Sequence, residues 1–115
     1  MMSDEETLYE KGARNLNEVY AGDVVAMPEG TMPFIDVMTR TLFGEVWDRD
    51  VLSIRDRRLL LMGVIAAQGQ SDIWKIQAKS ALKRGELSAD ELRETLIMLA
   101  PCLLYTSDAA DEVLG

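Results

Sequence analysis

The residues with the clearest chemistry are arginines in the middle of the chain. Four of them fall within ten residues: Arg49, Arg55, Arg57 and Arg58. A guanidinium binds a carboxylate through two parallel hydrogen bonds, so this cluster can clamp an acidic ligand. Four carboxylates lie in or beside the same stretch: Glu45, Asp48, Asp50 and Asp56. For any single arginine a salt bridge to one of these neighbours is the simpler interpretation, and both interpretations stay open here.

The residue types that carry most nucleophilic and acid–base catalysis are nearly absent. The chain has no histidine and a single cysteine, Cys102. This composition excludes histidine general bases, cysteine–histidine dyads, the commonest zinc ligand sets and an internal disulfide.

Length and composition are typical of one globular domain. The 115 residues are 48% hydrophobic and carry a net charge of −8. An acidic surface repels nucleic acid and anionic membranes, so we expect neither as a partner. No apolar run is long enough to span a membrane, and the acidic "MMSDEETLYEKG" is unlike a signal peptide. We therefore expect a cytoplasmic protein.

Capping and stop signals predict an all-α chain of about five helices. A Ser3–Glu6 capping box opens the first helix, in which Gly12 is either a weak point or a site of close packing. Thr31 caps the second helix, which ends before Gly44.

The third predicted helix is apolar on every side. Ser53 opens it, residues 59–67 are apolar all round, and Gly69 ends it. A buried strand would also fit the apolar run, but the cap and the helix-forming leucines and alanines favour a helix. We expect this helix to be buried in a core or in an oligomer.

Two further helices complete the prediction. Ser71 caps the fourth, which stops at Gly85, and a Ser88–Glu91 capping box opens the fifth, which stops at Pro101. The expected inner face of the fourth helix consists of Ile73, Ile76, Ser80 and Ala81.

Two long segments resemble a known family: "FGEVWDRDVLSIRDRRLLLMGVIAAQGQ" and "IWKIQAKSALKRGELSADELRETLIMLAP". They contain a series of turn and helix-end motifs that resembles, in the same order along the chain, the pattern of the carboxymuconolactone decarboxylase family, within the alkylhydroperoxidase-like superfamily. "LYEKGARNLNEVYAGD" is similar to that family's first helix. The resemblance implies a bundle of five to six helices, assembled as a homo-oligomer, a trimer or hexamer. It also implies decarboxylation without a metal or organic cofactor.

The resemblance suggests which residues form the site. Gln77 stands where decarboxylases of this family have a histidine, and Arg57 lies in the family's R-x-R-x-L helix opening, so we predict both as catalytic. Trp74, Arg49 and Glu45 are the predicted substrate-binding residues. Gln77 is equally well read as an interhelical polar contact, and Trp74 as part of a subunit interface. Because a carboxamide accepts no proton near neutral pH, Glu45, Tyr20 or water would have to supply the proton.

The superfamily's peroxidase branch uses a Cys-x-x-Cys pair that this chain lacks. The corresponding positions here are Gln70 and Ile73. Attack on a peroxide requires a thiolate, so we predict no peroxidase activity.

The C-terminal "CLLYTSDAADE" is similar to a translated sequencing adapter rather than to the family's continuation. We therefore predict a truncated domain at residues 1–101 and an adapter-derived tail at residues 102–115. Cys102 would then not belong to the natural protein.

Two functions stay open. One is decarboxylation of 4-carboxymuconolactone, or of a related lactone or β-keto acid, in aromatic catabolism. The other is a non-catalytic homo-oligomer of the same fold that binds a small molecule and has lost the active-site histidine.

Overall fold

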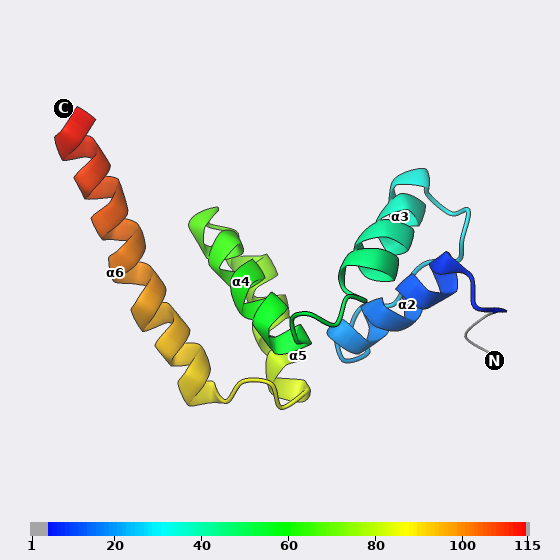
Figure 1. Cartoon of the computed structure of the whole chain (residues 1–115). Coiled ribbons are helices and arrows are strands. Elements are labelled where there is room, and N and C mark those ends of the chain that lie inside the picture. The colour runs from blue at the N-terminus through cyan, green and yellow to red at the C-terminus, as the bar shows by residue number, and fades with distance from the viewer. Residues whose placement is uncertain (1–4, 115) are drawn as a thin grey trace. The chain divides into compact units, whose positions relative to one another are not determined.

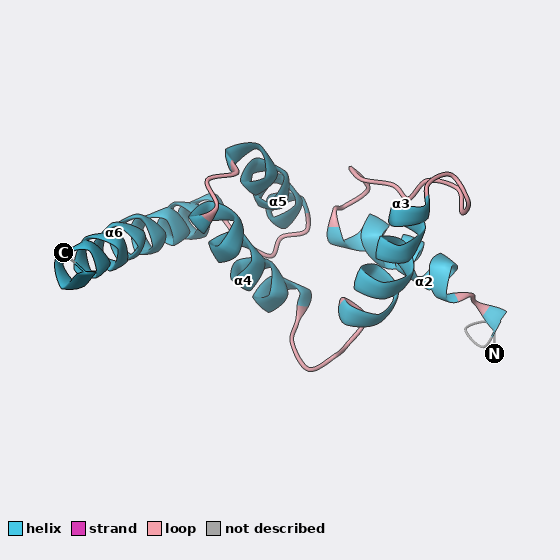
Figure 2. Ribbon diagram, turned by 90° about the horizontal axis from the view of Figure 1, so that it is seen from above, coloured by secondary structure: helices cyan, strands magenta, loops and turns pink. Residues whose placement is uncertain are grey.

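The computed structural model describes residues 5–114, and the side chains of residues 5–102. The elements in this range are all helical, in the order α2, α3, η1, α4, α5, α6, as predicted for an all-α chain (Figures 1 and 2). Within it, no helix is both long enough and apolar enough to cross a membrane. The chain divides into two compact units, residues 1–57 and 58–115.

The first unit begins with helix α2 (Leu8–Val19). Its capping box is formed by Thr7 and Glu10: the Thr7 backbone N–H donates to Glu10 Oε1 at 2.8 Å, and the Glu10 N–H donates to Thr7 Oγ1 at 3.1 Å. The box predicted at Ser3 starts outside the described residues.

Helix α3 (Pro33–Met38) continues directly into the π-helix η1 (Thr39–Val46). Two predictions are wrong here. Thr31 does not cap α3, because its hydroxyl donates to the Pro28 carbonyl at 2.6 Å and Met32 occupies the N-cap position. Gly44 does not follow the helix but lies inside η1, where a Cβ would be 3.0 Å from Leu8 atoms, so it is buried for packing.

Helix α2 packs on η1 at very short range. A Cβ on Gly12 would lie 1.9 Å from the Thr39 carbonyl oxygen, so Gly12 is a site of close packing rather than a weak point. The Asn15 side chain donates to the Phe43 carbonyl oxygen at 2.8 Å and thereby satisfies a buried acceptor of the π-helix. Leu16, Val19 and Phe43 form the core of this unit.

The second unit contains most of α4 (Ile54–Ala67), then α5 (Ser71–Lys83) and α6 (Ala89–Leu114). Several predicted signals are confirmed. Ser53 Oγ accepts from the Asp56 N–H at 3.0 Å, and Ser88 and Glu91 form a reciprocal capping box. Gly69 and Gly85 both adopt φ +69°, the left-handed conformation that ends a helix.

Two predicted helix ends in this unit are wrong. Gln70 rather than Ser71 is the N-cap of α5. Helix α6 does not stop at Pro101 but passes through it. Proline removes one backbone donor from a helix, yet the leucine- and alanine-rich residues on either side favour the helical conformation strongly enough to continue it.

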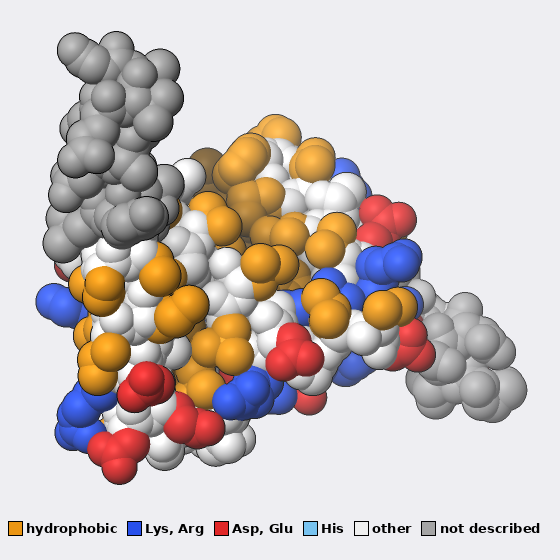
Figure 3. Space-filling model, turned by 60° about the vertical axis from the view of Figure 1, so that its left-hand side comes forward, with side chains coloured by type: hydrophobic (Ala, Val, Ile, Leu, Met, Phe, Trp, Pro, Cys, Tyr) orange, Lys and Arg blue, Asp and Glu red, His pale blue; other side chains and the backbone are white. Residues whose placement is uncertain are grey.

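Helix α4 buries one face rather than all of its surface. Met62 packs with Ala81, Leu87 and Leu92 in the core of the second unit. Leu60 and Val64 remain 69% and 51% exposed, so the expectation of all-round burial does not hold within one chain. Hydrophobic side chains on the molecular surface are visible in Figure 3.

The packing of α2 on η1 predicts a large effect of one added methyl group. Gly12→Ala places a Cβ where the Thr39 carbonyl stands, so we expect a loss of about 2–3 kcal/mol in the free energy of unfolding, measured by urea titration. Gly63→Ala is the matched control, because its Cβ would meet only Leu99 Cδ2 at 3.9 Å. Alanine there favours the helix by up to about 1 kcal/mol. Equal destabilisation by the two substitutions would contradict the close packing.

Candidate functional site

A buried arginine connects three segments of the second unit. Arg58 of α4 is 0% exposed. Its Nη1 donates to Gln77 Oε1 of α5 at 2.9 Å. Its Nε and Nη2 donate to the two carboxylate oxygens of Glu86, at 2.6 and 3.1 Å. Glu86 lies in the loop between α5 and α6, so one guanidinium fixes α4, α5 and this loop to one another.

The charges of this network compensate one another. Burial raises the pKa of Glu86, but hydrogen bonds from Arg58 and Arg84 lower it more, and the net shift is downward. Glu86 is therefore ionised at neutral pH and offers no proton. A buried cation without an anion beside it would be strongly destabilising, so the carboxylate is a structural requirement of Arg58.

Gln77 is a buried member of the network. The described buried residues of α5 are Gln77, Ser80 and Ala81, whereas Ile73 and Ile76, predicted to share that face, are 42% and 44% exposed. Gln77 is 2% exposed, and its amide oxygen accepts from Arg58. Gln77 therefore makes an interhelical polar contact, which was one of the two roles considered for it from the sequence. Its catalytic role stays a prediction.

A small pocket of about 290 Å³ lies where α4 ends and α5 begins. Its lining residues are Ala66, Gly69, Gln70, Ser71, Trp74, Lys75 and Leu96. Trp74 also packs against the core of this unit, and its indole Nε1 is buried without a partner among the described residues. The wall of the pocket is therefore almost entirely apolar.

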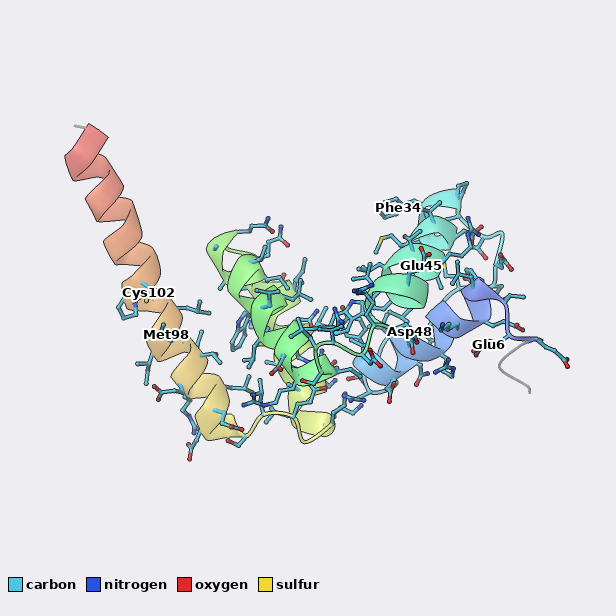
Figure 4. The ribbon with its side chains drawn as sticks, in the orientation of Figure 1. Glu6, Phe34, Glu45, Asp48, Met98 and Cys102 are labelled. Atoms are coloured by element: carbon cyan, nitrogen blue, oxygen red, sulfur yellow. The ribbon has the colours of Figure 1, made fainter. Side chains whose placement is uncertain are left out.

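The predicted site residues fall into both units. Trp74 and Gln77 lie on α5 of the second unit, and only Trp74 lines the pocket. Arg57, Arg49 and Glu45 belong to the first unit. Arg57 donates to the backbone carbonyls of Arg49 at 2.9 Å and Leu52 at 3.3 Å, which holds the turn before α4. Glu45 is exposed near the end of η1 (Figure 4). The catalytic role of Arg57 and the substrate-binding roles of Arg49 and Glu45 stay predictions.

Sequence reasoning did not select the residues that form the buried network. Arg58 was grouped with its neighbours, although it shares a face with Met62 and Ile65, four and seven residues further along α4. That spacing marks a buried position and was the available signal. Glu86, between the left-handed Gly85 and the buried Leu87, gives no comparable signal. Among the described residues, no group of three or more His, Cys, Asp or Glu side chains could hold a metal ion.

The Arg58–Glu86 pair predicts a pH-dependent contribution to stability. Because the pKa of Glu86 is lowered by folding, its stabilisation is complete above its ordinary pKa of 4.5 and is lost as the pH falls through the lower folded value. We expect Glu86→Gln to cost about 3 kcal/mol of unfolding free energy at pH 7. The difference from wild type should shrink below pH 4.5.

Asp90→Asn is the control for this measurement. Asp90 pairs with Arg93 at the surface, where its side chain is 93% exposed, so its loss should change stability by less than about 0.5 kcal/mol. A Glu86→Gln variant as stable as Asp90→Asn at pH 7 would show that the buried charge is not compensated by Glu86.

Comparison with known proteins agrees with the all-helical fold. The sequence model of the carboxymuconolactone decarboxylase family matches residues 33–110. This range contains Arg58, Trp74 and Gln77, and it extends past Pro101, so the predicted origin of residues 102–115 stays a prediction. No curated protein and no solved structure matches the chain. Since the match spans more than half of its residues, this chain belongs to the carboxymuconolactone decarboxylase family.

Proposed function

We propose that this protein is a cytoplasmic carboxy-lyase that decarboxylates a carboxylated lactone or β-keto acid without a cofactor. 4-Carboxymuconolactone, an intermediate of aromatic catabolism, is the reference substrate. The observation that carries the proposal is the apolar pocket at the start of α5, found in a chain of this family. A pocket of this size accommodates a single small ring.

The apolar walls of the pocket favour the loss of carbon dioxide from a bound acid. The bond between the ring carbon and the carboxylate carbon breaks, and the electron pair is delocalised onto the lactone carbonyl oxygen as an enolate. Ala66, Trp74 and Leu96 offer apolar contacts that disfavour the localised charge of the carboxylate more than the spread charge of the transition state. Water then returns a proton to the carbon.

The second candidate function is a non-catalytic binder of the same class of molecule. The environment of Gln77 favours this second function. The Gln77 amide oxygen already accepts a hydrogen bond from Arg58, and a carboxamide does not accept a proton. In this case the pocket binds the acid and releases it unchanged.

The two candidates are separated by the absorbance of 4-carboxymuconolactone. We expect the wild-type chain to consume it, and Ala66→Trp, which fills the pocket, to lower kcat/KM at least about tenfold. Ala67→Trp is the matched control, because Ala67 is exposed and does not line the pocket. Equal activity of the two variants would contradict chemistry in this pocket.

Gln77→His tests the buried position directly. An imidazole there would stand beside the Arg58 guanidinium, which disfavours its protonated form, so we expect no gain in activity. Turnover by the histidine variant alone would support the non-catalytic candidate for the natural chain.

Self-association is part of the proposal. Leu60 and Val64 of α4 are exposed apolar side chains, which supports a homo-oligomer, a trimer or hexamer, covering them. Native mass spectrometry measures this directly. Leu60→Glu should shift the mass toward the monomer, whereas Lys79→Glu, at another exposed helix position, should not. A monomeric wild-type chain would contradict the proposal.

A further inference from the structure

The wall of the pocket at the start of α5 consists almost entirely of carbon. Trp74 contributes ring carbons, because its Nε1 is itself buried, and Ala66 and Leu96 contribute aliphatic groups. Three lining residues have polar side chains, and all three are exposed: Gln70, Ser71 and Lys75. Since the wall has almost no polar surface, the polar atoms of these side chains do not face the pocket.

The backbone groups around the pocket are already paired. The Gly69 N–H donates to the Ala66 carbonyl at 3.0 Å. The Gln70 N–H donates to the Ile65 carbonyl at 3.2 Å, and the Gln70 carbonyl accepts from the Trp74 N–H at 3.0 Å. These bonds belong to the end of α4 and the start of α5. A polar ligand would therefore lose its hydrogen bonds with water here and regain few of them.

The size of the pocket limits the ligand. An apolar cavity of about 150 Å³ holds one benzene molecule. This pocket has about 290 Å³, so it takes one ring with its branches, or a compact cage, of up to roughly ten carbon atoms. The space exists because α4 ends in small residues: Ala66 and Gly69 lie in the lining, where larger side chains would fill it.

We propose that this pocket is a binding site for an uncharged hydrocarbon group of up to roughly ten carbon atoms. Trp74 and Leu96 contact the group, and Leu96, now 48% exposed, is removed from water. A charged group is disfavoured by the same wall, because nothing there compensates its lost hydration. The inference goes beyond the proposed function, since it concerns binding alone and does not require decarboxylation.

One consequence rests on the proposed function and narrows its substrate class. A carboxylate gains nothing from this wall, so the affinity for an acid must come from its hydrocarbon part. That binding energy also offsets the desolvation of the carboxylate before carbon dioxide leaves. The preferred substrate is then an acid with a compact hydrocarbon part, and the dicarboxylate 4-carboxymuconolactone fits the pocket poorly.

Fluorescence of Trp74 provides the binding measurement. The chain has two tryptophans, and Trp47→Phe leaves Trp74 as the sole reporter while preserving a ring that can stack on Phe43. The probes are three compounds that do not absorb near the indole band: 1-adamantanecarboxamide, the smaller cyclohexanecarboxamide, and the anion 1-adamantanecarboxylate. All are titrated at pH 7, and calorimetry at two temperatures gives the heat-capacity change.

We expect 1-adamantanecarboxamide to bind most tightly, with a negative heat-capacity change, the mark of buried apolar surface. Each buried CH₂ group is worth about fourfold in affinity, so cyclohexanecarboxamide, with a smaller hydrocarbon part, should bind at least about tenfold more weakly. The anion should bind more weakly than the amide of the same cage. This series uses one chain and depends on no change inside the pocket.

A pair of substitutions locates the binding. Ala66→Leu fills part of the pocket and should weaken 1-adamantanecarboxamide at least about tenfold. Ala67→Leu is the matched control, because Ala67 is exposed on the same helix and does not line the pocket. It should leave the affinity unchanged.

Four outcomes would overturn the inference. These are equal affinity of the two amides, tighter binding of the anion, equal effects of Ala66→Leu and Ala67→Leu, and affinity that falls as the concentration of the chain rises. The last would show that a second copy of the chain occupies the pocket.

The result is independent of turnover. Binding of the probes as expected, without decarboxylation of any acid, would leave the inference standing and contradict the proposed activity. Decarboxylation of 4-carboxymuconolactone by a chain that does not bind 1-adamantanecarboxamide would contradict the inference and leave the activity standing.

Discussion

The buried guanidinium of Arg58 is the constraint around which the second unit is built. A fully buried cation is tolerated only with an anion beside it and with acceptors for its remaining N–H groups. Glu86 supplies the anion and Gln77 one acceptor. The left-handed Gly85 ends α5 just before Glu86, so the chain turns where the carboxylate must reach Arg58. Helix packing and loop geometry thus both place hydrogen-bonding partners beside the Arg58 guanidinium.

This constraint also accounts for the residue at position 77. The guanidinium donates toward that position, so an acceptor is required there, and an amide oxygen accepts at every pH. A protonated imidazole would place one cation against another. Gln77 itself offers no acid–base chemistry, because a carboxamide neither takes up nor releases a proton near neutral pH. The pocket that remains accessible to a ligand lies one turn earlier on α5, at Trp74.

The sequence predicted those features that depend on neighbouring residues. The caps at Ser53 and at Ser88–Glu91 and the left-handed ends at Gly69 and Gly85 are local, and each is confirmed. The π-helical continuation through Gly44 was missed because it depends on contacts with α2, from Gly12 and Asn15, which lie far away in sequence. The pairing of Arg58 with Glu86 joins residues 28 positions apart, and no local pattern marks the partner. Of the candidate site, Trp74 could be placed from helical spacing, whereas the contributions of Ala66 and Leu96 required the shape of the pocket.

Helix α4 buries a charged side chain and exposes apolar ones, the reverse of the usual arrangement. It buries Arg58 completely, yet Leu60, two residues later, is 69% exposed. In an isolated chain this arrangement is unfavourable on both faces, since a charge is desolvated and leucine is hydrated. The buried face is explained by Glu86 and Gln77. The exposed face is explained if another copy of the chain covers it, because burying Leu60 and Val64 together would contribute roughly 3 kcal/mol per subunit from the hydrophobic effect. Self-association and the buried network would then be two consequences of the same helix sequence, one on each face.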